Sequence, residues 1–236
     1  MEFRFDRAII GQPYGGLGDN FQFSTLPEMF ARCGIDTYIS SQNVCRNPQI
    51  YELIWGLNPF VKGVTNEPPN ISVFDVEKSP KVRELNTVQR AEMMYFGWWE
   101  HNFPVTFYKP KFREDFANKT VLEFGFVTVN LTASLDRIKE HLSFILDGQE
   151  PVLLKNPVNP SLDIGKYPAY EVRDIFELAD IFYSCRAFAG IESGAAVLCA
   201  TMKGVRQHNG IYVFCREIHR TMRAFVYPNQ TLVVVT

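Results

Sequence analysis

The sequence of 236 residues contains no run of about twenty uninterrupted apolar residues, the length that a helix needs to cross a bilayer. It also lacks an excess of charge, since 24 Lys and Arg stand against 26 Asp and Glu. A protein that binds nucleic acid by bulk electrostatics needs a strongly basic face, so this balance excludes nucleic acid as a partner. Residues Met1 to Asp6 are charged rather than signal-like. We therefore expect a cytoplasmic protein without a transmembrane segment.

Metal and disulfide signatures are also missing. The five cysteines are scattered, odd in number and without a C-x-x-C pair, which argues against both a disulfide framework and a zinc site. The four histidines show neither metal-ligand spacing nor an obvious carboxylate partner: His101, His141, His208 and His219. We expect them at the surface or in packing, and we expect no metal and no cofactor.

Strands and helices alternate in two blocks along the chain. Apolar runs bounded by turn residues predict strands over 8–11, 37–40, 61–64, 71–74, 121–129, 152–154, 187–191, 211–215, 224–227 and 231–235. Helix-like spacings fill the gaps, with Asn47-Pro48 and Thr87 as helix starts. Pro27 either kinks the helix predicted over 21–31 or begins its second part. The alternation predicts an α/β protein of two Rossmann-like lobes with mainly parallel sheets and a cleft between them.

One stretch breaks this rhythm. Residues 101–118 carry Pro104, Pro110, several charges and many aromatics, which is typical of an interdomain linker. We predict an N-terminal lobe over 1–105, a linker over 106–117 and a C-terminal lobe over 118–236. The aromatic region from Phe96 to Phe112 is either core and linker packing, or an exposed platform for an acceptor sugar or a second subunit.

The first loop that could carry chemistry is rich in glycine and reads Gly-Gly-Leu-Gly-Asp-Asn over 15–20. Glycines allow a ligand to approach the backbone and allow positive φ, and the N–H groups of a helix start favour an anion such as a diphosphate. A carboxylate at Asp19 would keep a low pKa beside the helix N-terminus. The third glycine of a dinucleotide fingerprint is replaced by Phe21, and no P-loop Gly-Lys-Ser/Thr occurs. The alternative is a plain turn with Asp19 as N-cap.

The second loop is Gly-Ile-Glu-Ser-Gly-Ala-Ala over 190–196. Small residues at a helix start expose N–H groups, Ser193 adds a hydroxyl, and Glu192 is placed to accept hydrogen bonds from sugar hydroxyls. The spacing excludes a nucleophile elbow. The alternative is an N-cap serine followed by alanines that pack against a sheet.

Together, the two loops resemble motifs of the GT-B fold glycosyltransferases related to the ADP-heptose:lipopolysaccharide heptosyltransferases. Gly-Leu-Gly-Asp-x-x-Gln-Phe over 16–23 is similar to the family's glycine-rich loop. Residues 178–180, the strand at 187–191 and Ser193-Gly194 followed by small residues are similar to its C-terminal motif. The likeness is distant, covers 8–64 and 171–204, and implies a shortened framework.

The resemblance implies that Asp19 is the general base that deprotonates the acceptor hydroxyl. It also implies that Ser193-Gly194 holds the donor diphosphate without a metal, with inversion at the transferred sugar. The expected donor-binding residues are Gly16, Gly18, Glu192, Ser193, Gly194 and Ala195. The chain departs from the family at Val197, where most members have His, and it lacks the family's Lys-containing turn at 128–132. Lys155 is a candidate substitute contact for phosphate.

We therefore predict a glycosyltransferase that moves a sugar from a nucleotide-diphosphate donor to an acceptor, which could be a glycan or lipid-linked. The alternative is a non-catalytic domain of transferase type that binds a nucleotide, sugar or protein partner. An NAD-dependent oxidoreductase is disfavoured by the broken fingerprint. Self-association through the region from Phe96 to Phe112 is a further prediction.

Overall fold

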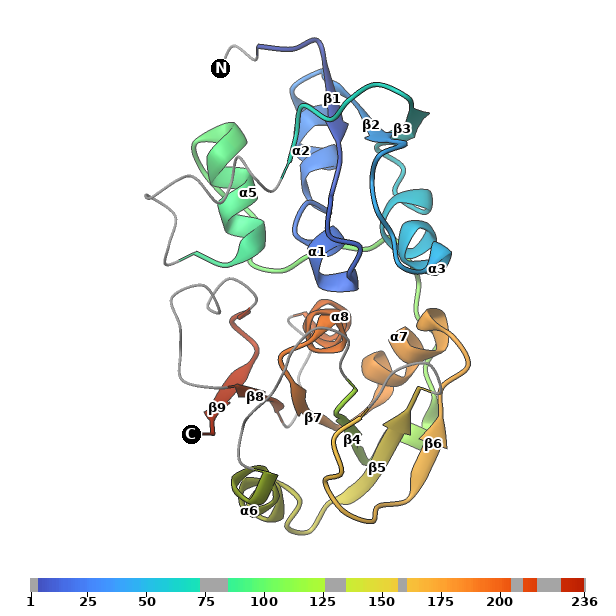
Figure 1. Ribbon diagram of the computed structural model, residues 1–236, viewed down its shortest axis with the longest axis vertical. Coiled ribbons are helices and arrows are strands. Elements are labelled where there is room, and N and C mark those ends of the chain that lie inside the picture. The colour runs from blue at the N-terminus through green and yellow to red at the C-terminus, as the bar shows by residue number, and fades with distance from the viewer. Residues whose placement is uncertain are drawn as a thin grey trace. The chain divides into compact units, whose positions relative to one another are not determined.

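Figure 1 shows the computed structural model, which describes residues 4–72, 85–125, 135–156, 161–204, 210–215 and 226–235. The described residues form two compact units, unit 1 up to Tyr108 and unit 2 from Lys109 onward. Both contain a parallel sheet with helices, so the predicted α/β class with two mainly parallel sheets is confirmed. The predictions for residues 73–74, 126–129 and 224–225, the Lys-free turn at 128–132, His208 and His219 lie outside the described residues.

Unit 1 contains a three-stranded parallel sheet in the order β1-β2-β3, with bounds Arg7–Ile10, Asp36–Ser40 and Val61–Thr65. Its helices are α1 (Leu17–Phe21), α2 (Leu26–Arg32), α3 (Pro48–Tyr51) and α5 (Thr87–Phe96). A π-helical segment, Glu52–Gly56, continues α3. Register pairs such as Ile10 with Ile39 place apolar side chains of β1 and β2 in the core.

Local signals explain how these helices begin and end. Pro27 occupies the first turn of α2, where a missing N–H costs nothing, so the predicted helix is divided into α1 and α2. Asn47 caps α3 by accepting the N–H of Gln49 at 2.8 Å. Asn86, and not Thr87, caps α5 through a capping box with Gln89, which corrects the expected start. Leu57, the C-cap of the π-helical segment, is exposed.

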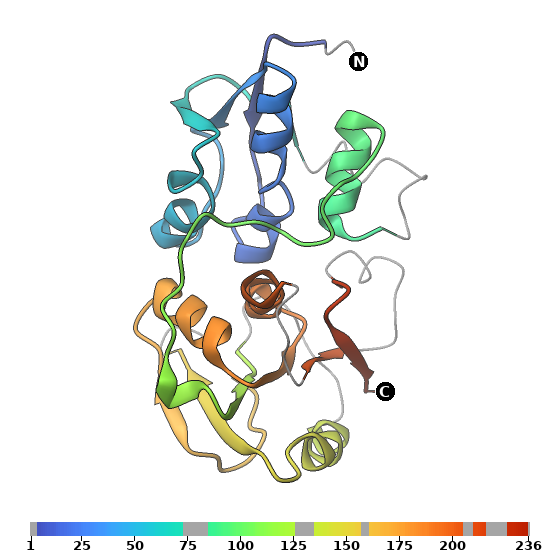
Figure 2. The same cartoon turned by 180° about the vertical axis from the view of Figure 1, so that it is seen from behind.

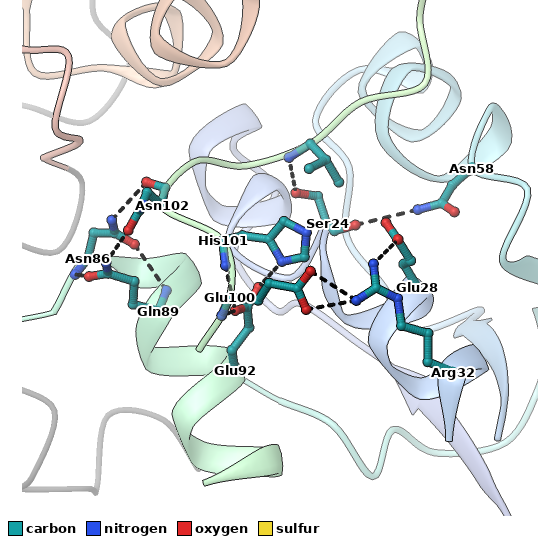
Figure 3. Close-up of polar contacts among 11 residues, drawn as sticks. Ser24, Glu28, Arg32, Asn58, Asn86, Gln89, Glu92, Glu100, His101 and Asn102 are labelled. Atoms are coloured by element: carbon teal, nitrogen blue, oxygen red, sulfur yellow. Dashed lines mark hydrogen bonds and ion pairs between the residues drawn. The ribbon is translucent and has the colours of Figure 1, made fainter. Parts of the chain in front are cut away.

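The chain that leaves α5 is fixed to unit 1 by a buried carboxylate (Figure 3). Glu92 accepts the N–H groups of Glu100 at 2.7 Å and His101 at 3.0 Å, and His101 Nδ1 lies 2.7 Å from its other oxygen. The expectation that His101 has no carboxylate partner is therefore wrong. The hydrogen bond to Glu92 raises the pKa of His101. Further along, Ser24 accepts the N–H of Val105 at 2.9 Å.

The segment predicted to be a linker is bound to both units at the residues where it enters and leaves. Thr106 donates to the carbonyl of Leu53 in unit 1. In unit 2, the N–H of Lys111 donates to Asp180 and the N–H of Arg113 donates to Ser184, each at 2.7 Å. The boundaries at 105 and 118 stay a prediction for independently folding lobes.

The aromatic region from Phe96 to Phe112 contains both buried and exposed side chains. Phe96 is buried and packs on Phe30 with ring centroids 4.9 Å apart, whereas Trp98, Trp99 and Phe112 are exposed. Contacts of these exposed residues with a sugar or a second subunit stay predictions. Among the helices that the structure describes, none is both long and apolar enough to span a membrane.

Unit 2 contains a six-stranded parallel sheet in the order β6-β5-β4-β7-β8-β9. The strands are β4 (Lys119–Glu123), β5 (Glu150–Lys155), β6 (Ala169–Glu171), β7 (Ala187–Ile191), β8 (Ile211–Cys215) and β9 (Thr231–Val234). Counted along the chain this is the order 3-2-1-4-5-6 of a Rossmann fold. The short β6 was not predicted, and residues 226–227, predicted as strand, lie outside one although Tyr227 is buried.

Helices cover both faces of this sheet (Figures 1 and 2). Helix α6 (Leu135–Ile145) lies on one face, whereas α7 (Ile175–Ser184) and α8 (Gly194–Lys203) lie on the other. Ile138 and Leu142 of α6 are fully buried in a core with Leu122, Phe124 and Phe214, among others. Because helices cross on opposite faces, the strand order reverses between β4 and β7, and this reversal positions the second loop.

Candidate functional site

The glycine-rich loop connects β1 to α1 in unit 1. Gly16 is the N-cap, and Asp19 is the third helical residue, whose Oδ2 accepts the N–H of Gly16 at 3.1 Å. Asp19 therefore supplies only the N3 half of a capping box, since glycine has no side chain to accept an N–H in return. Asp19 is not the N-cap, which corrects the plain-turn alternative in its detail. A methyl group on Gly16 would collide with the Asp19 carboxylate. None of Gly15, Gly16 and Gly18 has a positive φ. Glycine at 16 is therefore explained by the close approach of the Asp19 carboxylate, and not by a left-handed backbone.

The ionisation of Asp19 differs from the expectation. Burial raises the pKa of Asp19 above its usual value, and the opposing effects of the Gly16 N–H and the Arg46 charge do not cancel it. Helix α1 has only five residues, so its dipole offers little compensation for lost solvent. The predicted low pKa is therefore wrong. A carboxylate with a raised pKa accepts a proton more readily, which suits a general base.

The second loop lies at the topological switch point of unit 2. Strands β4 and β7 are adjacent, with Glu123 opposite Gly190 in the register. A methyl group on Gly190 would collide with the carbonyl of Glu123, so glycine is required for this close approach. In open α/β sheets, ligands bind beyond the carboxyl ends of the strands at such a point. Glu192 and Ser193 follow β7 directly at this edge.

Helix α8 begins at this edge without a side-chain cap. Ser193 is its N-cap residue but makes no capping bond to the helix, and its hydroxyl instead donates to Glu123 Oε2 at 3.5 Å. The N–H groups in the first turn of a helix have no intrahelical acceptors, and the macrodipole adds positive potential there. Gly194 and Ala195 therefore present N–H groups suited to an anion.

Two carboxyl groups flank this helix start, and sequence reasoning found only Glu192. Burial raises the pKa of both Glu123 and Glu192 to about 7. Glu123 Oε1 accepts the N–H of Gly125 at 3.0 Å, whereas Glu192 Oε2 is buried without a hydrogen-bond partner in the described part of the chain. The signal that could have found Glu123 is a charged residue directly after the buried Val121-Leu122 pair.

The remaining predicted site residues fall in different places. Lys155 ends β5, the strand next to β4, and its side chain is exposed at the same edge of the sheet. Val197, in the position where the family resemblance expects His, is buried in α8. The structure thus brings Glu192, Ser193, Gly194 and Ala195 together in unit 2, and Gly16, Gly18 and Asp19 together in unit 1.

The buried carboxyls predict a pH-dependent stability. A carboxyl whose pKa rises from 4.5 to about 7 on folding holds its proton longer in the native state. The free energy of unfolding should therefore fall as the pH rises from about 4.5 to 7, by at most about 3 kcal/mol per group. Urea denaturation of Glu123→Gln and Glu192→Gln should give greater stability than the wild type at pH 8 and near-equal stability at pH 4.5. Parallel pH profiles for the wild type and both variants would contradict the burial of these groups.

Comparison with known proteins gives structural matches only. No family model matches the sequence, and no curated protein matches it. The fold is similar to TibC, an iron-containing dodecameric heptosyltransferase from enterotoxigenic E. coli whose structure contains ADP-D-beta-D-heptose. This match has a TM-score of 0.65 and 14% identity, and covers 96% of this chain but 62% of TibC.

Two further solved structures have a fold similar to that of this chain. A family 9 glycosyl transferase from Veillonella parvula matches with a TM-score of 0.62 and 9% identity over 100% of this chain and 87% of its own. ADP-heptose lipopolysaccharide heptosyltransferase II of E. coli matches with a TM-score of 0.52 and 7% identity, over 96% of this chain and 90% of its own. The chain thus spans less than two thirds of TibC, and its distant resemblance to the heptosyltransferases is confirmed at the level of the GT-B α/β fold.

Proposed function

We propose that this protein transfers a sugar from a nucleotide-diphosphate donor to an acceptor hydroxyl. The observation that carries the proposal is the start of α8 at the β4–β7 switch point, where Ser193 bonds to Glu123 and leaves the first amides of the helix open. A diphosphate matches such a site in charge and in its need for several N–H donors. The ADP-heptose bound to the structurally similar TibC supports a donor of this class.

Unit 2 would hold the donor. The N–H groups of Gly194 and Ala195 would take up the charge that develops on the departing diphosphate, and this electrostatic role is the one that a metal ion fills in other transferases. Glu192 would accept hydrogen bonds from sugar hydroxyls while it is ionised. The exposed Lys155 at the same edge is the candidate for a further phosphate contact.

Unit 1 would activate the acceptor. The Asp19 carboxylate removes the proton of the acceptor hydroxyl, and the oxygen then attacks the anomeric carbon from the face opposite the diphosphate. The carbon–oxygen bond to the diphosphate breaks with its electron pair, so the nucleoside diphosphate leaves and the configuration inverts. Because Gly16 has no side chain, it leaves room for the Asp19 carboxylate. The backbone of Gly16 and Gly18 would likewise allow a substrate to approach closely.

A non-catalytic binding domain is the second candidate. Two observations favour it: Val197 is buried where the family places His, and one oxygen of Asp19 already accepts the Gly16 N–H. Thermal-shift measurements with ADP-, GDP- and UDP-linked sugars separate the two candidates. Stabilisation by one sugar nucleotide and not by the free nucleotide favours the transferase, and silence across the panel favours the domain that binds another partner.

The first test of the transferase removes only the proton acceptor. Asp19→Asn keeps an oxygen for the Gly16 N–H, so the melting temperature and the donor-induced thermal shift should stay close to the wild type. Nucleoside diphosphate release should fall by at least about a hundredfold, the usual contribution of a general base. Asp36→Asn, an exposed residue at the start of β2, is the matched control and should keep wild-type turnover. Full turnover in Asp19→Asn would remove the proposed base.

The second test places a charge at the helix start. Ala195→Asp adds a carboxylate in the first turn of α8, which should stabilise the helix by up to about 1 kcal/mol. The same charge should repel a diphosphate and weaken donor binding by at least tenfold, measured by calorimetry. Ala195→Asn has the same shape without the charge and serves as the control. Equal donor affinity in the two variants would show that the diphosphate binds elsewhere.

A further inference from the structure

The segment that carries Asp19 is too short to hold its own shape. Helix α1 has five residues, fewer than an isolated helix needs to be stable, and a single bond joins the Asp19 side chain to Gly16. The direction in which the second carboxylate oxygen points therefore depends on what fixes the backbone around Asp19.

Two side-chain amides hold the carbonyl of Asp19 itself. Gln12 Nε2 and Gln22 Nε2 both donate to it, at 2.8 and 2.9 Å, and both glutamines are buried. The Gln12 side-chain oxygen is buried without a hydrogen-bond partner among the described residues. The carbonyl of Asp19 is thus the hydrogen-bonding partner that orients the Gln12 amide.

The next residue, Asn20, connects the loop to the rest of unit 1. It is fully buried, and its Nδ2 donates to the carbonyls of Gly16 at 3.0 Å and Val44 at 3.2 Å. Its Oδ1 accepts from Trp55 Nε1 at 3.0 Å and from Asn43 Nδ2 at 3.2 Å, and the thiol of Cys45 lies 3.6 Å from it. Both ends of one amide are therefore fully used.

The partner residues are themselves positioned for this contact. Trp55 lies in the π-helical segment Glu52–Gly56, a geometry that costs helix stability and occurs often at functional sites. The side-chain oxygen of Asn43 accepts the N–H of Gln12 at 2.9 Å. This bond connects the network to the residues between β1 and the glycine-rich loop. An apolar core would stabilise the fold without such desolvated amides, whereas a buried amide with all its hydrogen bonds made, as at Asn20, fixes one geometry.

We infer that Asn20 is a positioning residue for Asp19, which anchors the glycine-rich loop to Trp55 and Asn43 so that the carboxylate is held at one place and angle. The inference rests on the proposed function for its catalytic meaning. Asn20 does not contact the substrate in this account and acts through Asp19. A misplacement of about 1 Å in a reacting group is enough to cost a hundredfold in rate.

The test compares two buried asparagines of unit 1. Asn20→Ala removes the anchor, whereas Asn58→Ala removes a buried amide that bonds to the carbonyl of Ser24 and the N–H of Phe60. Both variants should lower the melting temperature. Only Asn20→Ala should reduce kcat, by tenfold or more with the donor KM unchanged within twofold, and shift the acidic limb of the pH–rate profile. Equal losses of kcat in both variants would overturn the inference.

A second readout does not depend on turnover. The pKa of Asp19, followed by carboxyl ¹³C NMR and assigned with Asp19→Asn, should change in Asn20→Ala and in Trp55→Phe, and stay at the wild-type value in Asn58→Ala. An unchanged titration in both network variants would overturn the inference even if transfer is observed. If no sugar nucleotide supports transfer by the wild type while the titration does change, the proposed function fails and the positioning of Asp19 by Asn20 stands. Trp55→Phe carries this test if Asn20→Ala does not fold.

Discussion

The reversal of strand order between β4 and β7 is the constraint on which the site in unit 2 depends. Parallel strands that are connected across opposite faces of a sheet leave their carboxyl ends uncovered at the point of reversal. At this point Gly190 allows β7 to approach the carbonyl of Glu123. The same approach brings the Ser193 hydroxyl within reach of the Glu123 carboxyl and away from the helix that it would otherwise cap. The open amides of α8 therefore follow from sheet topology and one glycine.

The site in unit 1 has two different physical requirements. For the base that we propose at Asp19, partial desolvation raises the pKa, and a partly desolvated carboxylate needs a rigid support. Burial supplies the first requirement at Asp19. The side-chain amides of Gln12, Asn20 and Gln22 supply the second, because a helix of five residues cannot. The cost of burying these polar groups is offset by the completeness of the hydrogen bonds around Asn20.

Short-range chemistry made most of the fold predictable. Asn47-Pro48 and Pro27 determine where helices begin through a side-chain cap and a fixed φ, and neither depends on distant contacts. The π-helical segment after Tyr51 was not predicted, because no local pattern signals its widened turn. The three-residue strand β6 was missed because its pairing with β5 comes from the sheet and not from its own sequence.

The site was predictable only where its residues are neighbours in the chain. Glu192 to Ala195 are consecutive in the chain, so spacing alone grouped them. Glu123 reaches Ser193 across 70 residues, and Glu92 reaches His101 through the turn after α5, so each pairing required the fold. The pKa of Asp19 was predicted in the wrong direction because burial, which a sequence does not show, outweighs the local hydrogen bond and Arg46.

The central claim is that the first amides of α8 bind the diphosphate of a nucleotide sugar. The most direct measurement is the ¹H–¹⁵N NMR spectrum of the whole chain, recorded while ADP-, GDP- and UDP-linked sugars are added in turn. One of these donors should produce its largest shift changes at the amides of Gly194 and Ala195, with smaller changes at Glu192 and Ser193. Saturable shifts that spare Gly194 and Ala195, or no shifts with any of the three donor classes, would contradict the account.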